Sequence, residues 1–201
     1  RVRLQDKTEI WLNAASQLRY PATFRNEPER RVELSGEAYF QVATDKSHPF
    51  IVKTNRQQIK VLGTHFNIKG YENEPVKTTL VEGSVEVSNE ASSKLLKPGQ
   101  QSMLFNNGNF VVGPSDVVLD LAWKNNEFMF ESESIENVMK MVERWYNVEV
   151  IYVGKISSEK FGGGVSRFEN VSKVLALLER TGAVKFKIEN RKIFVKSVTG
   201  L

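Results

Sequence analysis

The sequence predicts a mixed fold in which a β-rich domain over residues 1–115 precedes a small α+β domain over residues 116–201. Two observations lead to this prediction. In the first half, apolar and polar residues alternate around recurring glycines, and a period of two marks strands with one buried face. The character changes after Pro114, and from Ser134 the apolar residues recur every three or four positions, as in an amphipathic helix; this helical pattern occurs twice.

Four segments of the first half share one layout, in which a strand-like piece leads to a glycine and an alternating piece follows. The glycines are Gly36, Gly63, Gly83 and Gly99. They fit bends or bulges, where a Cβ atom would clash. After Gly63, Phe66 and Ile68 share one parity and are expected in the core. Short strands at this spacing are typical of a sandwich, a barrel or an irregular solenoid, and the spacing alone does not decide among them.

The helical pattern of the second half begins after Ser132 or Ser134, and serine is a favoured N-cap residue. The apolar stripe of this helix is Ile135, Val138, Met141, Val142 and Trp145. The pattern returns 33 residues later, where FENVSK follows the earlier IENVMK, and this spacing places Phe168 on the buried stripe of a second helix. Strand patterns flank both helices, so the sequence predicts a β-α-β unit that occurs twice and a final strand.

Composition narrows the possible functions. The net charge of +4 is spread over the chain without a basic arm, which argues against a nucleic-acid binder. The absence of cysteine excludes a disulfide framework, a thiolate metal site and a cysteine nucleophile. No apolar run reaches the roughly 20 residues of a membrane span. The chain opens on Arg1 within a strand-like pattern, so we expect it to be the soluble part of a longer protein.

The candidate catalytic side chains are few, and structural roles explain them. By parity His65 points away from the core together with Asn67, and His48 lies in a loop; no sequence pattern ties either histidine to a carboxylate. Paired acids can serve a glycosidase, but Glu37 and Glu86 fall on the outward, solvated faces of their strands.

The glycine-rich stretch FGGGV, residues 161–165, favours a strand or bulge. It lacks the Gly-Lys-Ser/Thr that a phosphate loop requires before its helix. We therefore predict no enzyme activity, no metal site and no cofactor.

The candidate partner-binding residues form a basic edge near the C-terminus. They are Lys185, Lys187, Arg191 and Lys192. Lysines on an open strand edge also protect it from aggregation, so the cluster is either a protective edge or a docking edge for a partner domain. A different function, glycan binding, would use Trp11 or Tyr39 as a stacking platform.

Several stretches within residues 4–104 together resemble the FecR family of transmembrane anti-sigma factors, in the form common in Bacteroidetes-type bacteria. They are DKTEIWLNAASQLRYP, RRVELSGEAYFQVA, PFIVKT, IKVLGTHFNI, TTLVEGSVEV and LKPGQQ. The tail from WKNNEFMF onward resembles the C-terminal domain that accompanies FecR and is similar to the secretin/TonB short N-terminal fold. Lys7 and Asn126 replace glycines of the family pattern; Asn suits a left-handed position, and Lys disfavours one.

The resemblance implies a β-solenoid-like FecR domain followed by a domain built on a βαβ repeat. It also implies that the chain is the periplasmic part of a single-pass inner-membrane protein whose cytoplasmic segment holds an extracytoplasmic-function sigma factor. The C-terminal domain would meet the signalling domain of a TonB-dependent outer-membrane transporter and relay its state, so that cell-surface signalling regulates transcription. The alternative is a periplasmic glycan-binding β-module without a signalling role.

Overall fold

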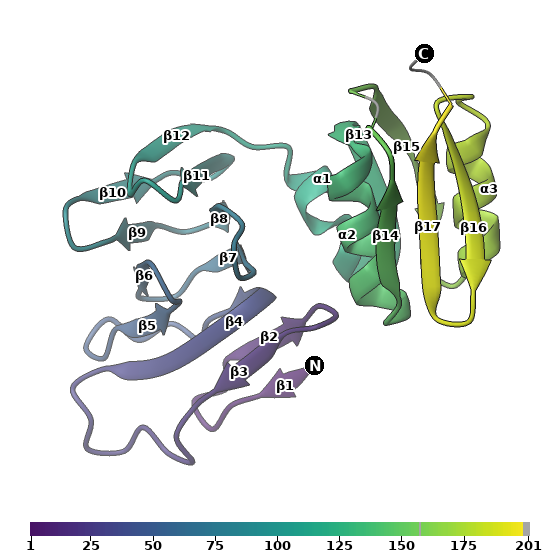
Figure 1. The fold of residues 1–201 in the computed structure, drawn as a ribbon. Coiled ribbons are helices and arrows are strands. Elements are labelled where there is room, and N and C mark those ends of the chain that lie inside the picture. Colours follow the sequence, from purple (N-terminus) through teal and green to yellow (C-terminus); the bar gives the residue numbers. More distant parts are fainter. Residues whose placement is uncertain (157, 199–201) are drawn as a thin grey trace. The chain divides into compact units, whose positions relative to one another are not determined.

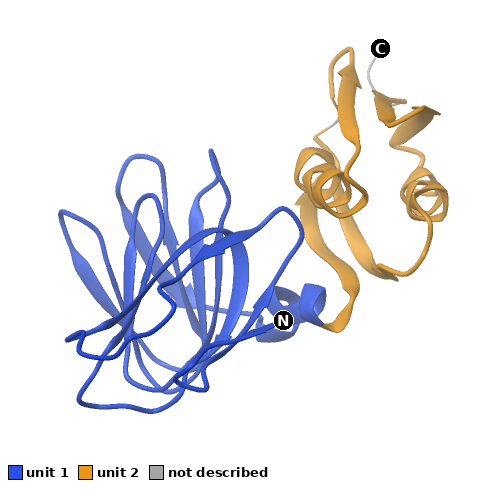
Figure 2. Cartoon of the chain, turned by 90° about the horizontal axis from the view of Figure 1, so that it is seen from below, with its two compact units in different colours: residues 1–124 blue, residues 125–201 orange. Residues whose placement is uncertain are grey.

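The computed structural model describes residues 1–156 and 158–198 and divides into two compact units (Figure 2). Unit 1 is Arg1–Lys124 and unit 2 is Asn125–Leu201. The sequence pattern places the boundary earlier, after residue 115. The helical segment that follows that position, formed by α1 (Val117–Leu121) and the 3₁₀ turn η1 (Ala122–Asn125), lies almost entirely in unit 1.

Unit 1 is built mainly from short strands. They are β1 (Val2–Arg3), β2 (Glu9–Leu12), β3 (Gln17–Arg19), β4 (Arg30–Gln41), β5 (Phe50–Lys53), β6 (Gln58–Val61), β7 (His65–Gly70), β8 (Val76–Glu82), β9 (Val85–Ser88), β10 (Ser93–Leu96), β11 (Gln100–Leu104) and β12 (Phe110–Pro114). They form one sheet with the main order β10-β9-β6-β5-β4-β7-β8-β11-β12; β2 and β3 also pair with β4, and β1 pairs with β2.

The long strand β4 makes this sheet a nearly closed, barrel-like layer (Figure 1). Its first half pairs with β3 and β5, and its second half pairs with β2 and β7. At the two ends of the sheet, β10 lies near β11 and β12. The β-rich class is confirmed. The solenoid-like arrangement is not, because the described strand pairs of unit 1 are antiparallel apart from β4 with β5, whereas a solenoid stacks successive parallel turns.

Two glycines provide the bends that the sequence predicts. Gly36 interrupts β4 where its pairing changes, with a φ of 98° that favours glycine, and a Cβ atom there would lie 2.7 Å from Ser16 Cα. Gly63 has a φ of 152°, and its Cβ would lie 2.7 Å from Thr44 Cα. Any larger residue at either position would have to displace neighbouring backbone.

The core of unit 1 follows the predicted alternation. Phe66 and Ile68 of β7 are buried with Phe40 of β4, and the Phe40 and Phe66 rings stack with centroids 5.0 Å apart. The opposite face of β7 differs from the prediction, because His65 is half-exposed but Asn67 is buried. On this outer face Asn67 lies beside the buried Tyr39 of β4 and donates to Glu37 at 3.0 Å.

Asp120 holds α1 against unit 1. Its carboxylate is 8% exposed and accepts hydrogen bonds from Thr79 Oγ1 at 2.6 Å, from Ser115 Oγ at 2.7 Å and from Lys77 Nζ. Thr79 and Lys77 both belong to β8. These contacts explain why the segment after residue 115 lies with unit 1, which the sequence pattern did not predict.

Unit 2 contains the predicted order of elements. They are β13 (Glu127–Ser134), α2 (Ile135–Tyr146), β14 (Glu149–Val153), β15 (Lys160–Ser166), α3 (Val171–Glu179), β16 (Val184–Glu189) and β17 (Lys192–Ser197). The two strands of each β-α-β unit lie in different sheets, since β13 pairs with β15 and the other sheet has the order β14-β17-β16. Both helices and both sheets contribute to one apolar core. The repeat is therefore not a pair of single-sheet βαβ crossovers.

The two β-α-β units repeat at a spacing of 36 residues, so the predicted spacing of 33 is wrong. Ser134 caps α2 by accepting the N–H of Asn137 at 3.2 Å, and Asn170, 36 residues later, caps α3 by accepting the N–H of Lys173 at 3.0 Å. The similar letters IENVMK and FENVSK thus occupy different places relative to their helices. Phe168, expected on a buried stripe, precedes α3 and is 81% exposed.

Candidate functional site

Each histidine lies beside a carboxylate, which the sequence did not indicate. His65 Nδ1 is 3.0 Å from Glu82 Oε2 across β7 and β8, and His48 Nδ1 is 3.0 Å from Asp45 Oδ2 within one loop. Hydrogen bonds to the Asp45 carboxylate lower its pKa well below its usual range. The largest contribution comes from the Ser47 hydroxyl and the next from the His48 side chain. Within the described residues, no group of three or more His, Cys, Asp or Glu side chains is placed to hold a metal ion.

Glu37 is not on a solvated face, which corrects the prediction made from its parity. Its side chain is 7% exposed, and its two carboxylate oxygens accept hydrogen bonds from Asn13 Nδ2 at 2.7 Å and from Asn67 Nδ2 at 3.0 Å. Glu86 is exposed, as predicted. Glu37 therefore ties the residues after β2 to β4 and β7.

The glycine-rich stretch lies within strand β15, as predicted. The residues from Arg167 to Asn170 separate it from the first turn of α3. Its backbone N–H groups therefore do not line a helix N-terminus, which is where a phosphate loop must place them.

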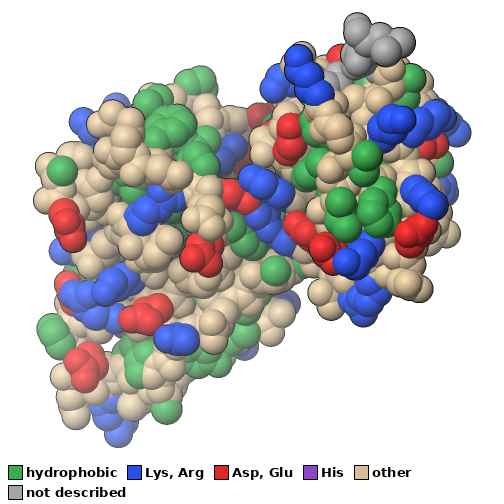
Figure 3. Space-filling view, in the orientation of Figure 1, with side chains coloured by type: hydrophobic (Ala, Val, Ile, Leu, Met, Phe, Trp, Pro, Cys, Tyr) green, Lys and Arg blue, Asp and Glu red, His purple; other side chains and the backbone are tan. Residues whose placement is uncertain are grey.

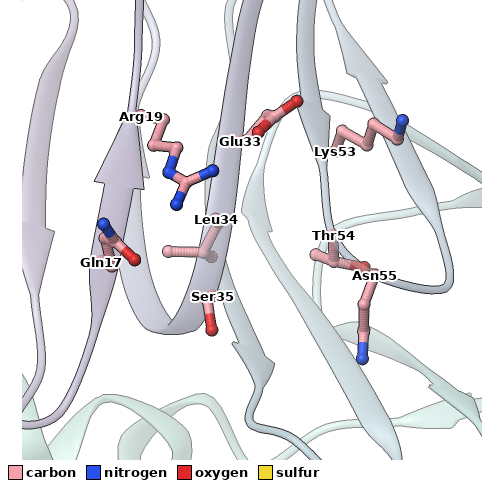
Figure 4. A pocket seen from close by; sticks show the side chains of 8 residues that line it. All are labelled: Gln17, Arg19, Glu33, Leu34, Ser35, Lys53, Thr54 and Asn55. Atoms are coloured by element: carbon pink, nitrogen blue, oxygen red, sulfur yellow. The ribbon is translucent and has the colours of Figure 1, made fainter.

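A polar groove of about 420 Å³ crosses three strands of unit 1 (Figure 4). The strand register places Arg19 of β3 next to Glu33 of β4, and Glu33 next to Lys53 of β5, across the floor of the groove. Its lining residues are Gln17, Arg19, Glu33, Leu34, Ser35, Lys53, Thr54 and Asn55. No aromatic ring lines the groove, so it offers no stacking surface for a sugar.

The aromatic pair that the sequence suggested as a stacking platform for a glycan is covered. Tyr39 is buried, and Trp11 is half-buried with its ring edge-on to Tyr39. Arg1 lies 4.8 Å above the Trp11 ring, and Lys124 Nζ lies 4.9 Å from the centroid of Trp11 and 5.0 Å from that of Tyr39. These cation–π contacts occupy the aromatic surface that a sugar would stack on.

The four predicted partner-binding residues are exposed in unit 2, but they do not form one continuous edge. Lys185 and Lys187 lie on the edge strand β16, whereas Arg191 and Lys192 lie at the turn into the central strand β17. Lys185 Nζ is 3.8 Å from a Glu179 oxygen, Lys192 Nζ is 3.1 Å from a Glu149 oxygen, and Lys187 pairs with Glu189. Arg191 Nε donates to the Asn147 carbonyl at 3.1 Å. Exposed ion pairs of this kind are weak, so these cations can exchange partners.

At each edge of the three-stranded sheet, the carboxylate of a helix glutamate accepts a hydrogen bond from a backbone N–H of the edge strand. Glu143 of α2 accepts the N–H of Val150 on β14 at 3.1 Å, and Glu179 of α3 accepts the N–H of Phe186 on β16 at 2.8 Å. Burial, together with nearby glutamates, raises the pKa of Tyr152 on β14 to about 12. Tyr152 is therefore a neutral phenol at physiological pH.

The outer face of this sheet has an apolar centre and a charged rim. Cross-strand register places Ile151 of β14, Phe194 of β17 and Lys187 of β16 side by side on that face, with Val153, Lys196 and Lys185 in the next row. Figure 3 shows hydrophobic side chains in the middle of unit 2 with basic and acidic ones around them. An apolar centre with a polar rim is the usual arrangement of a protein–protein interface.

No helix among the described residues has the length and apolar character needed to cross a membrane. This finding concerns the helices of the two units alone.

Comparisons with known proteins agree over both units. A family model described as FecR protein matches residues 1–86, and one described as FecR, C-terminal matches residues 127–195. A comparison with curated proteins gives no match. Two crystal structures of a proposed anti-sigma factor from Parabacteroides distasonis ATCC 8503, at 1.65 and 2.50 Å resolution, are each 30% identical to this chain, with TM-scores of 0.90 and 0.89. The matches cover 98% of this chain and 94% and 93% of those chains, so the chain belongs to the FecR family of anti-sigma factors.

Proposed function

We propose that this chain is the periplasmic signal-receiving part of a single-pass inner-membrane anti-sigma factor. In this proposal unit 2 binds the signalling domain of a TonB-dependent outer-membrane transporter. The binding event is relayed to an extracytoplasmic-function sigma factor through a cytoplasmic segment outside the sequence described here. The relay is a conformational or proteolytic switch, and no chemical catalysis is required of the chain.

The observation that supports docking at unit 2 is the outer face of its three-stranded sheet. Ile151 and Phe194 form an apolar centre there, and Lys185, Lys187 and Lys192 belong to its rim. Rim charges act mainly on the rate and selectivity of encounter, because they attract a partner of opposite charge before the apolar centre is buried. We therefore assign Lys185, Lys187, Arg191 and Lys192 the role of attracting an acidic surface of the signalling domain.

Isothermal titration calorimetry tests the partner. The chain is titrated with the signalling domain of the TonB-dependent transporter encoded beside it, and one-to-one binding with a dissociation constant in the micromolar range or below is expected. The absence of heat at high micromolar concentrations of both proteins contradicts the proposed partner.

Charge reversal tests the basic residues. The double variant Lys187→Glu/Arg191→Glu is expected to slow association and to weaken its dependence on salt, as measured by stopped-flow mixing. Lys94→Glu/Lys97→Glu is the matched control, because it makes the same charge change at two exposed positions of unit 1. Equal association rates for the two double variants would show that the basic residues do not contribute to the interface. The proposed partner would not be contradicted by that result.

A further inference from the structure

Strand β15 has an edge beside which no other strand lies. Among the described residues, it pairs with β13 alone. The middle of β15 is Gly162–Gly164, and all three glycines are exposed. We call the outward side of this segment the glycine edge. Its backbone is open to close approach, because no side chain stands beside it.

The direction of the backbone groups along the glycine edge follows from the pairing with β13. The N–H of Arg167 donates to the Asn126 carbonyl at 2.8 Å, so the backbone of Arg167 faces β13. Successive residues of an antiparallel strand alternate between facing their partner and facing away. Counting back from Arg167, Gly163 faces β13, and the N–H and C=O groups of Gly162 and Gly164 face outward.

The other sheet edges of unit 2 are protected against pairing with a further strand. On β14 and β16, Glu143 and Glu179 already occupy outward N–H groups. On β13, a bulge near Ser132, whose φ is 51°, interrupts the strand, and Glu127 and Glu131 place charges along it. Bulges and charges are the usual means by which proteins block edge pairing. Along Gly162–Gly164 the glycine edge has no charged side chain and no carboxylate on its N–H groups; Gly163 has a φ of 132°, and the exposed Lys160 lies at the start of the strand.

An exposed aromatic side chain lies close to the glycine edge. Phe168 is two residues beyond the end of β15 and is 81% exposed, more than any other large apolar side chain of the described chain. The Tyr146 hydroxyl donates to the Glu169 carbonyl at 2.6 Å and Trp145 Nε1 donates to the Arg167 carbonyl at 3.0 Å, so the backbone on both sides of Phe168 is fixed. Aromatic residues, phenylalanine included, are enriched at the centres of protein interfaces.

We propose that the glycine edge binds an extended strand of the transporter's signalling domain, which extends the β13-β15 sheet, and that Phe168 packs into an apolar pocket of that domain. This inference rests on the proposed function for the identity of the partner. On the outer face of the β13-β15 sheet, Glu127 lies opposite Ser166 and Met129 lies opposite Gly164, while the exposed Lys160 lies at the other end of β15, opposite Ser134. The added strand is therefore one with Lys or Arg on that face near the Ser166 end, where Glu127 lies.

A proline substitution at an outward-facing residue tests the strand addition. Gly162→Pro removes an N–H that β13 does not use and places a ring on the edge, so the β13-β15 pairing is retained and an added strand is blocked. Gly162→Ala is the matched control: it keeps the N–H, and its Cβ would meet only the Phe130 carbonyl oxygen at 3.8 Å. Calorimetry with the signalling domain is expected to show at least tenfold weaker binding for Gly162→Pro and an affinity for Gly162→Ala close to that of the unmodified chain.

A second variant does not touch the strand backbone. Phe168→Ala is expected to weaken binding at least tenfold without changing the melting temperature, because the side chain is already solvated in the unbound protein. Leu95→Ala is its control, since Leu95 is 66% exposed but lies in unit 1. Thermal unfolding of all four variants verifies that each one is folded.

The outcomes separate the two proposals. If the unmodified chain does not bind the signalling domain, the proposed function fails. If it binds, and Gly162→Pro and Phe168→Ala bind equally well while folded, the strand addition is overturned and the proposed function stands. Loss of binding in both variants, with both controls unaffected, supports the glycine edge. Should Gly162→Pro prove unfolded, the affinity of Phe168→Ala decides alone.

Discussion

Glu179 of α3 accepts the outward N–H of Phe186 on β16 at 2.8 Å, and this contact closes a sheet edge with a side chain. Glu143 and Val150 make the equivalent contact on β14, also from a helix to the strand that follows it. Both contacts span seven residues of sequence, at equivalent positions of the 36-residue repeat. The two β-α-β units therefore share the same means of protecting a sheet edge, in addition to the same order of elements.

Removal of this carboxylate is expected to open the β16 edge. Glu179→Ala leaves the Phe186 N–H without its partner, which costs about 1 kcal/mol of unfolding free energy for a charged acceptor that is partly solvated. The open edge is also expected to increase self-association, measured by sedimentation velocity at rising concentration. Glu189→Ala is the control, because it removes the same charge from β16, the strand that Glu179 caps, without uncapping an N–H. Identical sedimentation of the two variants would show that Glu179 does not guard the edge.

Ile135 and Phe168 begin similar hexapeptides, yet the structure gives them opposite environments. Ile135 is fully buried at the first turn of α2, whereas Phe168 is exposed before the cap of α3. Ile135→Ala is therefore expected to cost about 2–4 kcal/mol of unfolding free energy, and Phe168→Ala less than about 0.5 kcal/mol. Urea unfolding of the two variants measures both values. Equal losses would favour the 33-residue spacing and contradict the observed caps.

The error in the repeat spacing has a geometric cause. A shift of three residues along a helix is nearly one turn of 3.6 residues, so an apolar stripe fits almost equally well at spacings of 33 and 36. The caps carry the missing information: Ser134 and Asn170 are 36 residues apart, and both residue types are strong N-caps. The order of helices and strands was predictable because it depends on period alone.

The features that the sequence did not reveal depend on contacts between distant segments. Parity placed Phe66 and Ile68 in the core, but it could not show that Asn13 and Asn67 would enclose Glu37. The four candidate basic residues were identified from the clustering of Lys and Arg near the C-terminus of the sequence. The glycine edge was recognised only as a strand, because its importance depends on which edges elsewhere in unit 2 are occupied. Sheet order is a long-range property that alternation within a strand does not encode.

Asp120 is expected to control whether the α1 segment stays attached to unit 1. Asp120→Ala leaves Lys77 and Thr79 of β8 without their acceptor, and the loss of a largely buried carboxylate of this kind costs about 2–3 kcal/mol. Hydrogen–deuterium exchange in residues 117–124 is expected to accelerate more than in the strands of the barrel. Asp116→Ala removes the N-cap of α1 but none of its contacts with β8, and it serves as the control.

Unchanged exchange in residues 117–124 of Asp120→Ala would mean that other contacts hold the segment. The cation–π contacts of Lys124 with Trp11 and Tyr39 are the next candidates, and Lys124→Ala then tests them by the same measurement.

Lys7 occupies a backbone conformation that its side chain disfavours. Its φ is 71°, in a turn where its N–H donates to the Leu4 carbonyl at 3.1 Å and the Leu4 N–H donates to the Thr8 carbonyl at 2.9 Å. The buried Arg30 anchors this turn, because its guanidinium donates to Asp6 Oδ2 at 2.7 Å. The surrounding contacts therefore impose the positive φ despite the preference of lysine.

Replacement of Lys7 by asparagine is expected to stabilise unit 1. Asn tolerates the left-handed region better than Lys, and relief of this strain raises the unfolding free energy by about 0.5–1 kcal/mol. Lys7→Ala is the control, since it removes the same exposed side chain but keeps a residue that disfavours positive φ. Urea unfolding is expected to rank Lys7→Asn above both Lys7→Ala and the unmodified chain. If Lys7→Ala stabilises the chain as much as Lys7→Asn, the gain comes from loss of the lysine charge and not from backbone strain.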